Sequence, residues 1–217
     1  MTATLAPSII SADYRELQRQ LDLVAPYSAR WHVDVMDGHY VQNLTIGPMI
    51  VEAIRKASEL PQDVHLMITN PDETWEWYAR AGAARIAFHP SESPAPAKLL
   101  KTLDAAGIRP GIAVNPDVAV SDVEPLLDLC EWLIVMSVYP GFSGQEFIPE
   151  ALPKLRELRS LRPGLDLVID GGVNPRNAAR CVEAGASVLV SASAIFGSAD
   201  PAAVAEELAG IGATGPR

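Results

Sequence analysis

The stretch VEAGASVLVSAS (residues 182–193) contains the end of one predicted helix and the whole of the next predicted strand. Gly185 stands where a helix is often ended by a glycine in the left-handed conformation, and the apolar run Val188–Val190 follows it. The same order of helix, glycine and apolar run recurs in ARAGAARIAFHP (79–90) and DAAGIRPGIAVNP (104–116). The chain is therefore predicted to repeat a unit of one helix followed by one strand.

Eight apolar runs are predicted to be strands, and helical patterns fill the intervals between them. The strands are expected at Leu5–Ile10, Trp31–Met36, Val64–Ile68, Arg85–Phe88, Gly111–Val114, Leu133–Val138, Leu167–Ile169 and Val188–Val190. Helices are expected around Leu17, Leu21 and Val24, at Met49–Ala57 after Pro48, at Asp72–Ala81 after Pro71, and around Leu152, Leu155 and Leu158. A further helix is expected at Arg176–Ala184, with Asn174 as its N-cap and Pro175 at the first helical position.

The alternation of these strands and helices over 217 residues predicts an α/β fold, a single-domain (β/α)8 TIM barrel spanning residues 1–217. No GxGxxG motif follows the first strand, which counts against a doubly wound, dinucleotide-binding sheet. The Gly-rich tail, residues 210–217, is expected to be flexible.

Net charge, apolar runs and cysteine content argue against several classes of protein. The net charge of −10 argues against a nucleic-acid partner, although backbone amides can still bind a small phosphate locally. No apolar run approaches the ~20 residues of a membrane span, and the N-terminus lacks the features of a secretory signal. Two widely spaced cysteines fit a reducing compartment. We therefore expect a cytoplasmic protein with neither a membrane nor a nucleic-acid partner.

Polar side chains recur on one face of three predicted strands. In WHVDVMD (31–37), His32 and Asp34 alternate with valines; His65 lies in DVHLM (63–67), and Asp170 ends the strand of LVIDGG (167–172). In a barrel, the face opposite the valines points inward, near the strand ends where barrel enzymes place their chemistry. Two imidazoles and two carboxylates there predict a site for Zn, Fe(II), Mn or Co, the alternative being a hydrogen-bonded polar core.

Three methionines, Met36, Met67 and Met136, fall on the same inward faces. They are expected either to fill the core or to form an apolar lining that keeps water from the reacting centre, and the two roles are compatible.

The loops after the last three predicted strands are rich in glycine and small residues. They read YPGFSGQEF (139–147), DGGVNP (170–175) and SASAIFGS (191–198). Late loops of this kind often bind phosphate in barrels, because their backbone N–H groups can approach a ligand closely. The candidate phosphate and substrate contacts are Gly141, Phe142, Ser143, Gly144, Gly171, Gly172, Ala192 and Ser193.

Taken together, the motifs resemble those of the ribulose-phosphate 3-epimerase family over nearly the whole chain. They are APSIISAD (6–13), HVDVMDGHYVQNLTIGP (32–48), DVHLM (63–67), FHP (88–90), NP (115–116), VMSVYPGFSGQEFIP (135–149), IDGGVN (169–174) and SAIF (193–196). The resemblance implies a (β/α)8 barrel, a homo-oligomer, a ketose phosphate substrate, one divalent metal ion and no organic cofactor. It implies metal ligation by His32, Asp34, His65 and Asp170, with Asp34 and Asp170 also the catalytic acid–base pair, and Ser8 and His65 as substrate contacts.

The activity implied is that of the pentose phosphate pathway epimerase, which interconverts D-ribulose 5-phosphate and D-xylulose 5-phosphate. Inverting a carbon next to a ketone requires a proton to leave one face and return to the other, and two opposed carboxylates can do this through a metal-stabilised enediolate.

The chain departs from the family pattern at Ser143, where glycine is common, at Ala192, where glycine is usual, and at Gln42, where proline is usual. These departures leave open a 3-epimerase of a six-carbon ketose phosphate such as D-allulose 6-phosphate. A non-catalytic sugar-phosphate-binding barrel is the third reading.

Overall fold

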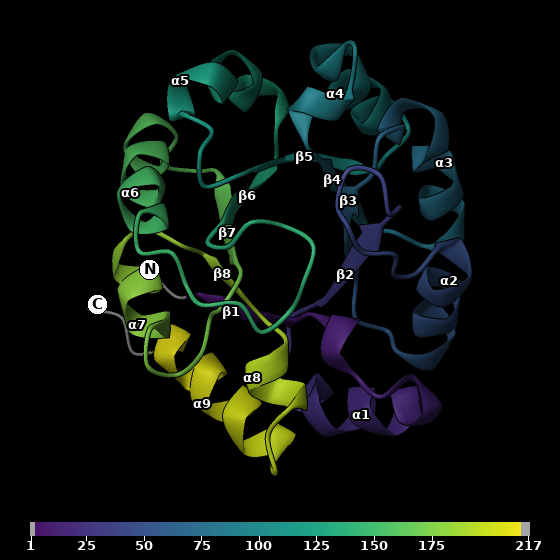
Figure 1. Cartoon of the computed structure of the whole chain (residues 1–217), viewed down its shortest axis with the longest axis vertical. Coiled ribbons are helices and arrows are strands. Elements are labelled where there is room, and N and C mark those ends of the chain that lie inside the picture. The colour runs from purple at the N-terminus through teal and green to yellow at the C-terminus, as the bar shows by residue number, and fades with distance from the viewer. Residues whose placement is uncertain (1–2, 214–217) are drawn as a thin grey trace.

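The computed structural model describes residues 3–213 and shows one ring of parallel strands surrounded by helices (Figure 1). The strands are β1 (Thr4–Pro7), β2 (Trp31–Met36), β3 (Gln62–Met67), β4 (Arg85–Phe88), β5 (Arg109–Val114), β6 (Trp132–Met136), β7 (Asp166–Asp170) and β8 (Val188–Ser191). Each strand pairs with the next along the chain from β2 to β8, and β8 pairs with β1. The predicted barrel is confirmed.

The barrel closes between β1 and β2 through a narrow seam. A parallel bridge joins Ser8 to His32, and the Ala29 amide donates to the Leu5 carbonyl at 2.9 Å. The strand predicted to run to Ile10 ends at Pro7, because Ser8 caps a short 3-10 turn and accepts a hydrogen bond from the Ile10 amide at 3.3 Å. The seam therefore lies beside one of the polar side chains of β2.

The outer layer consists of helices that follow the strands in sequence. They are α1 (Leu17–Val24), α2 (Pro48–Ala57), α3 (Pro71–Ala81), α4 (Pro96–Ala105), α5 (Val120–Val123), α6 (Ala151–Leu161), α7 (Ala178–Glu183), α8 (Ser193–Phe196) and α9 (Pro201–Ala213), with 3-10 turns η1 (Ile9–Ser11), η2 (Tyr14–Glu16), η3 (Ala25–Tyr27), η4 (Pro90–Glu92) and η5 (Glu124–Leu129). None of the helices within residues 3–213 has the length and apolarity of a membrane span.

Among the helices, α7 and α9 depart most from the sequence predictions. Helix α7 begins at Ala178 rather than at Arg176, because Asn174 Oδ1 accepts from the Arg176 amide at 3.0 Å and forms a turn before the helix. Helix α9 includes the first residues of the expected flexible tail, as far as Ala213. The rest of that tail, residues 214–217, lies outside the described residues, so its flexibility stays a prediction.

The core has two layers, one between strands and helices and one inside the barrel. Val33 and Val35 face the helices, as predicted from their alternation with His32 and Asp34. Inside the barrel, small residues on β1, β4 and β5 face larger ones on β6 to β8. Gly111 illustrates the fit, because a Cβ there would lie 2.4 Å from Nε1 of Trp132. The interior is a packed core with no room for an extra methyl group at that point.

A buried ionic network fills the barrel at the N-terminal ends of its strands. Arg85 on β4 has a side chain only 2% exposed and donates to Asp63 on β3 and, at 2.5 Å, to Asp166 on β7. Its guanidinium carbon lies 4.2 Å from the ring centroid of Trp132. Every guanidinium nitrogen of Arg85 therefore has a carboxylate partner.

Asp63→Asn should destabilise the fold by about 3–5 kcal/mol, because it leaves the buried Arg85 guanidinium without half of its compensating charge. Urea denaturation followed by circular dichroism measures the loss. The matched control is Asp128→Asn, which breaks the exposed pair with Arg162 and should cost no more than about 1 kcal/mol. Equal, small effects of both substitutions would contradict a stabilising role for the network.

Candidate active site

Four polar side chains predicted to converge do so at the C-terminal end of the barrel. His32 and Asp34 come from β2, His65 from β3 and Asp170 from β7, and Asp34 pairs in register with His65. His32 Nε2 lies 3.2 Å from Asp34 Oδ1 and 3.4 Å from Asp170 Oδ2; His65 Nδ1 lies 3.4 Å and 3.6 Å from the same oxygens. One donor atom from each residue lies within 4.8 Å of all the others.

The donor atoms of this cluster fit a divalent metal ion better than they fit one another. Both imidazoles are fully buried, yet His32 Nε2 and His65 Nδ1 have no partner in hydrogen-bond geometry, although the carboxylate oxygens are close. Buried polar atoms are almost always hydrogen-bonded, so atoms that converge without bonding one another suit a role as ligands of a cation. Two imidazole nitrogens and two carboxylate oxygens are a donor set that Zn, Fe(II), Mn or Co accepts.

The charges within the cluster also favour a cation at this place. Burial alone would raise the pKa of Asp34 and Asp170, but the neighbouring imidazoles hold both below their usual range. Burial alone would lower the pKa of His32, but the two carboxylates raise it to about 10. Carboxylates buried in this way require positive charge beside them, from protons or from a metal ion.

Hydrogen bonds from neighbouring residues hold the Asp34 carboxylate and the backbone of Asp34 and Asp170. The Ser8 hydroxyl donates to Asp34 Oδ2, and the Thr45 hydroxyl donates to the Asp34 carbonyl at 2.7 Å. On the opposite side of the barrel, the amide of Ser137 donates to the Asp170 carbonyl at 2.7 Å. Each carboxylate is therefore carried on a strand whose end is anchored to a neighbouring strand or loop.

Asp37, which directly follows β2, bonds to the loops beside the cluster and not to the cluster itself. Its Oδ1 accepts from the amides of His39 and Tyr40, and its Oδ2 accepts from the amide and hydroxyl of Thr69. It therefore ties the loops after β2 and β3 together.

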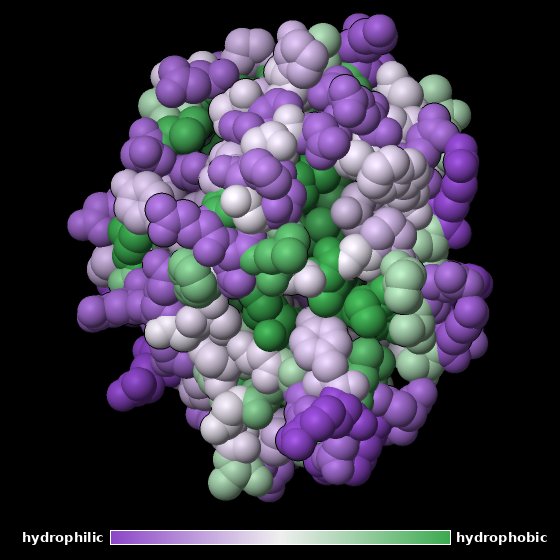
Figure 2. Space-filling view, turned by 45° about the vertical axis from the view of Figure 1, so that its right-hand side comes forward, coloured by the Kyte–Doolittle hydropathy of each residue, from purple (hydrophilic) through white to green (hydrophobic). Residues whose placement is uncertain are grey.

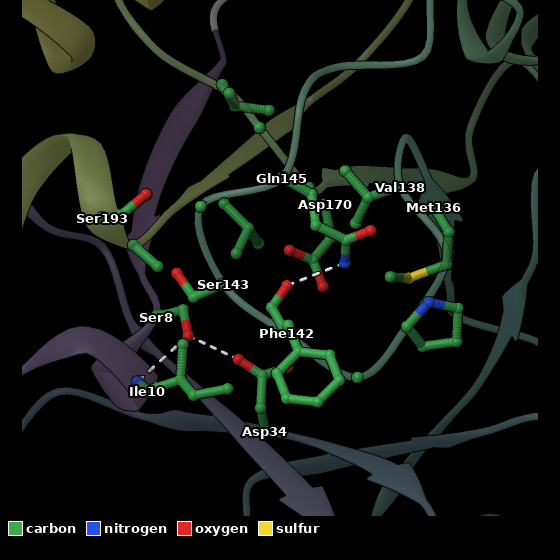
Figure 3. Close-up of a pocket in the computed structure, with 18 of the residues that line it drawn as sticks. Ser8, Ile10, Asp34, Met136, Val138, Phe142, Ser143, Gln145, Asp170 and Ser193 are labelled. Carbon is green, nitrogen blue, oxygen red and sulfur yellow. Dashed lines mark hydrogen bonds between the residues drawn. The ribbon is translucent and has the colours of Figure 1, made fainter. Parts of the chain in front are cut away.

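A pocket of about 300 Å³ opens directly above the cluster, and the two carboxylates form part of its wall (Figure 3). Met36, Met67 and Met136 all line this pocket, and their role in keeping water from a reacting centre stays a prediction. The wall also includes these predicted contacts: Ser8, Gly141, Phe142, Ser143, Gly144, Gly171, Gly172, Ala192 and Ser193. His65, which the resemblance also placed against the substrate, is fully buried and does not line the pocket; it belongs to the cluster beneath.

The loop between β6 and α6 forms one side of the pocket mouth and is held by cross-connections. Asn43 donates to the Gly141 carbonyl at 2.7 Å, and Gln145 donates to the Phe142 carbonyl at 2.9 Å (Figure 3). Ser143, which replaces a glycine common in the family pattern, bonds the Ser11 hydroxyl at 2.7 Å. These contacts tie the loop to the segments after β1 and β2. Gln42, the third departure, is exposed and does not line the pocket.

The glycines after β7 are required by the backbone itself. Gly171 and Gly172 have φ angles of 116° and 64°, and added Cβ atoms would lie 2.5 Å from Val138 Cγ2 and 2.8 Å from the Phe147 amide nitrogen. Only glycine fits this turn, which brings the backbone against the pocket.

Several large apolar side chains are exposed on the surface of the barrel. Phe142 is 56% exposed, and Leu44 and Met49 in the segment after β2 are exposed further still. Figure 2 shows apolar side chains gathered near the centre of one face, with hydrophilic residues around them.

Two residues of this region were missed by the sequence analysis. Arg176 is the one basic side chain among the described residues that line the pocket, and its place directly after DGGVNP could have indicated it. His89, within the FHP motif, is buried with its Nε2 2.9 Å from Nε2 of His65. Burial, with the imidazole of His65 beside it, holds the pKa of His89 well below its usual value.

Comparison with known proteins agrees with this geometry. Residues 4–196 match the sequence model of the ribulose-phosphate 3-epimerase family. The chain is 40% identical over 211 residues to the cytoplasmic isoform of ribulose-phosphate 3-epimerase from Oryza sativa subsp. japonica, covering 95% of this chain and 92% of the relative. It is 39% identical over 212 residues to ribulose-phosphate 3-epimerase from Bacillus subtilis, covering 95% of this chain and 98% of the relative.

A relative from Arabidopsis thaliana, 39% identical and covering 97% of this chain and 76% of the relative, is named as chloroplastic, so the family does not fix the compartment. Among solved structures, KGPDC from Streptococcus mutans superposes with a TM-score of 0.74 at 13% identity, covering 98% of each chain. At that identity the likeness concerns the barrel fold alone.

A divalent metal ion should stabilise the protein after treatment with chelator. At a free Co²⁺ concentration about 100 times its Kd, the free energy of unfolding should rise by about 2.7 kcal/mol, because the ion binds the folded cluster and not the unfolded chain. Thermal denaturation with and without Co²⁺ measures the gain. His65→Ala should lose it, while His39→Gln, at an exposed histidine outside the cluster, should keep it. A full Co²⁺ gain in His65→Ala would place the ion elsewhere.

Proposed function

The chain belongs to the ribulose-phosphate 3-epimerase family, and from this premise we propose that it interconverts D-ribulose 5-phosphate and D-xylulose 5-phosphate. It is an isomerase acting on carbohydrates, and the family supports a pentose-phosphate substrate. The observation that carries the proposal is the pair of buried carboxylates, Asp34 and Asp170, which belong to the cluster and also line the pocket.

The reaction that we propose uses both carboxylates as acid and base. Asp34 stands on β2 and Asp170 on β7, so a sugar held between these strands presents opposite faces of one carbon to them. One carboxylate removes the proton from that carbon, and the other, in its acid form, returns a proton to the opposite face. In the reverse direction the two residues exchange roles, as microscopic reversibility requires.

His32, Asp34, His65 and Asp170 would hold the divalent ion, which when bound supplies Lewis-acid stabilisation for negative charge on the substrate oxygens. The protein contributes the fixed positions of these donors, through Ser8 and Thr45 at Asp34 and Ser137 at Asp170. It also contributes the three methionines, whose apolar side chains limit the access of water to the reacting carbon.

The substrate phosphate is proposed to lie against the loops after β6, β7 and β8. The tight turn at Gly171 and Gly172 brings backbone to the pocket wall, and Ser193 adds a hydroxyl. Because the phosphate is remote from the reacting carbon, its binding energy can be used to position that carbon between the carboxylates.

A six-carbon ketose phosphate is the second candidate substrate, because Ser143 and Ala192 both line the pocket and both depart from the family pattern. The bond between the hydroxyls of Ser143 and Ser11 is exposed and involves neither carboxylate. Rates measured on a pentulose phosphate and on a hexulose phosphate decide between the two substrates. The proposed proton transfer by the two carboxylates is the same for both.

Asp170→Asn should lower kcat by about 10²–10⁴-fold, because an amide can neither remove nor return the proton. Circular dichroism should show an unchanged fold, since the substitution keeps the shape of the side chain. The wild-type reaction in D₂O should place deuterium at C3 of the product, which mass spectrometry or NMR detects. Near-normal turnover by Asp170→Asn, or a product without solvent deuterium, would rule out the two-base reaction.

Arg176→Ala should raise KM for the sugar phosphate by about tenfold, equivalent to about 1.4 kcal/mol, and leave kcat nearly unchanged. The reason is that Arg176 is the basic side chain of the pocket wall and would attract the phosphate without touching the reacting carbon. Steady-state kinetics at low ionic strength measure the change. Arg180→Ala, in helix α7 four residues further along the chain and outside the pocket wall, is the control. An effect confined to kcat would show that Arg176 acts on the chemical step instead.

A further inference from the structure

A third buried imidazole adjoins the candidate metal cluster without belonging to it. His89 follows β4 and is 2% exposed. Its Nε2 lies 2.9 Å from Nε2 of His65, and the two ring centroids are 5.1 Å apart with planes inclined by 32°. The opposite nitrogen of His65, Nδ1, faces Asp34 and Asp170. His65 therefore connects the cluster on one side to His89 on the other.

The protons on these two rings can be assigned from their positions. Two imidazole nitrogens 2.9 Å apart share one hydrogen bond, so one nitrogen donates and the other accepts. If Nδ1 of His65 offers its lone pair to a metal ion, the proton of that ring must sit on Nε2. The acceptor is then Nε2 of His89, and the proton of His89 must sit on its Nδ1.

We propose that His89 is a positioning residue that accepts the hydrogen bond from His65 Nε2 and so keeps His65 Nδ1 directed at the metal ion. This inference rests on the proposed metal-dependent function. A metal-bound imidazole usually donates its other N–H to a fixed acceptor, which sets both the tautomer and the orientation of the ring. Here that acceptor is another histidine in place of the more common carboxylate or carbonyl.

His89 is itself held on two sides. The proline that follows, Pro90, favours extended backbone before it, and His89 has φ −82° and ψ 122°. The ring of Tyr40 packs against the imidazole with centroids 4.7 Å apart. The hydroxyl of Tyr40 accepts from Asn115 Nδ2 at 2.9 Å, and Lys154 donates to the Asn115 carbonyl at 2.6 Å. The acceptor for His65 is thus fixed by the segments after β2, β4 and β5.

A purely structural role for His89 makes a different prediction. If the ring only fills space beside Tyr40, phenylalanine should replace it with no effect on metal binding. If the ring accepts from His65, phenylalanine keeps the packing and removes the acceptor, while glutamine loses the ring and can supply a carbonyl oxygen as acceptor. His89→Phe and His89→Gln therefore separate shape from hydrogen bonding.

The experiment compares Co²⁺ binding to the metal-free full-length wild type, His89→Phe and His89→Gln, by titration of the visible Co²⁺ absorption. The control is His39→Gln, at an exposed histidine outside the cluster. His89→Phe should bind Co²⁺ about 10- to 100-fold more weakly, His89→Gln should recover most of that loss, and His39→Gln should match the wild type. In the Zn²⁺-loaded protein, NMR should show a slowly exchanging Nε2–H of His65 that His89→Phe loses.

Wild-type affinity in His89→Phe, or a His65 N–H that still exchanges slowly in that variant, would overturn the positioning role. If that variant does not fold, the wild-type NMR spectrum decides alone, because a proton on His89 Nε2 contradicts the assignment and a proton on its Nδ1 supports it. Failure of the proposed function has a separate signature: the wild type itself would bind no Co²⁺ at the cluster.

Discussion

Two carboxylates buried side by side at the end of a closed barrel are the constraint on which this site depends. Asp34 and Asp170 offer oxygens within 4.8 Å of each other, and both side chains are almost completely removed from water. Such a pair is stable only beside positive charge and hydrogen-bond donors. The imidazoles of His32 and His65 and the hydroxyl of Ser8 meet part of that requirement, and a divalent ion would meet the rest. The same negative charges are the basis of the proposed acid–base chemistry.

Buried polar groups have different partners at the two ends of the barrel. At the N-terminal ends of the strands, each guanidinium nitrogen of Arg85 has a carboxylate partner in Asp63 or Asp166. At the C-terminal ends, His32 Nε2 and His65 Nδ1 are buried but lack hydrogen-bond partners. The satisfied network stabilises the fold, whereas the unsatisfied one marks a place for something that the polypeptide does not supply.

The sequence predicted the barrel and the four cluster residues because both follow from strict periodicity. Alternation along β2 separated His32 and Asp34 from the valines, and parallel strands of a closed barrel necessarily bring such faces together. Arg176 and the pairing of His89 with His65 were not predictable in the same way. Their positions depend on how loops fold over the barrel end, and loop geometry follows from contacts between distant segments, such as Tyr40 with Asn115.

The carboxylates proposed to move the proton lie on strands, while the pocket wall proposed to hold the phosphate comes largely from loops. This division has an evolutionary consequence. A substitution such as the serine at position 143 can alter the mouth of the pocket and form a new contact with Ser11 without moving either carboxylate. Substrate range and proton chemistry can therefore evolve independently. Substitutions in the loops can change which sugar phosphate is accepted, while the two carboxylates proposed for the proton transfer are kept.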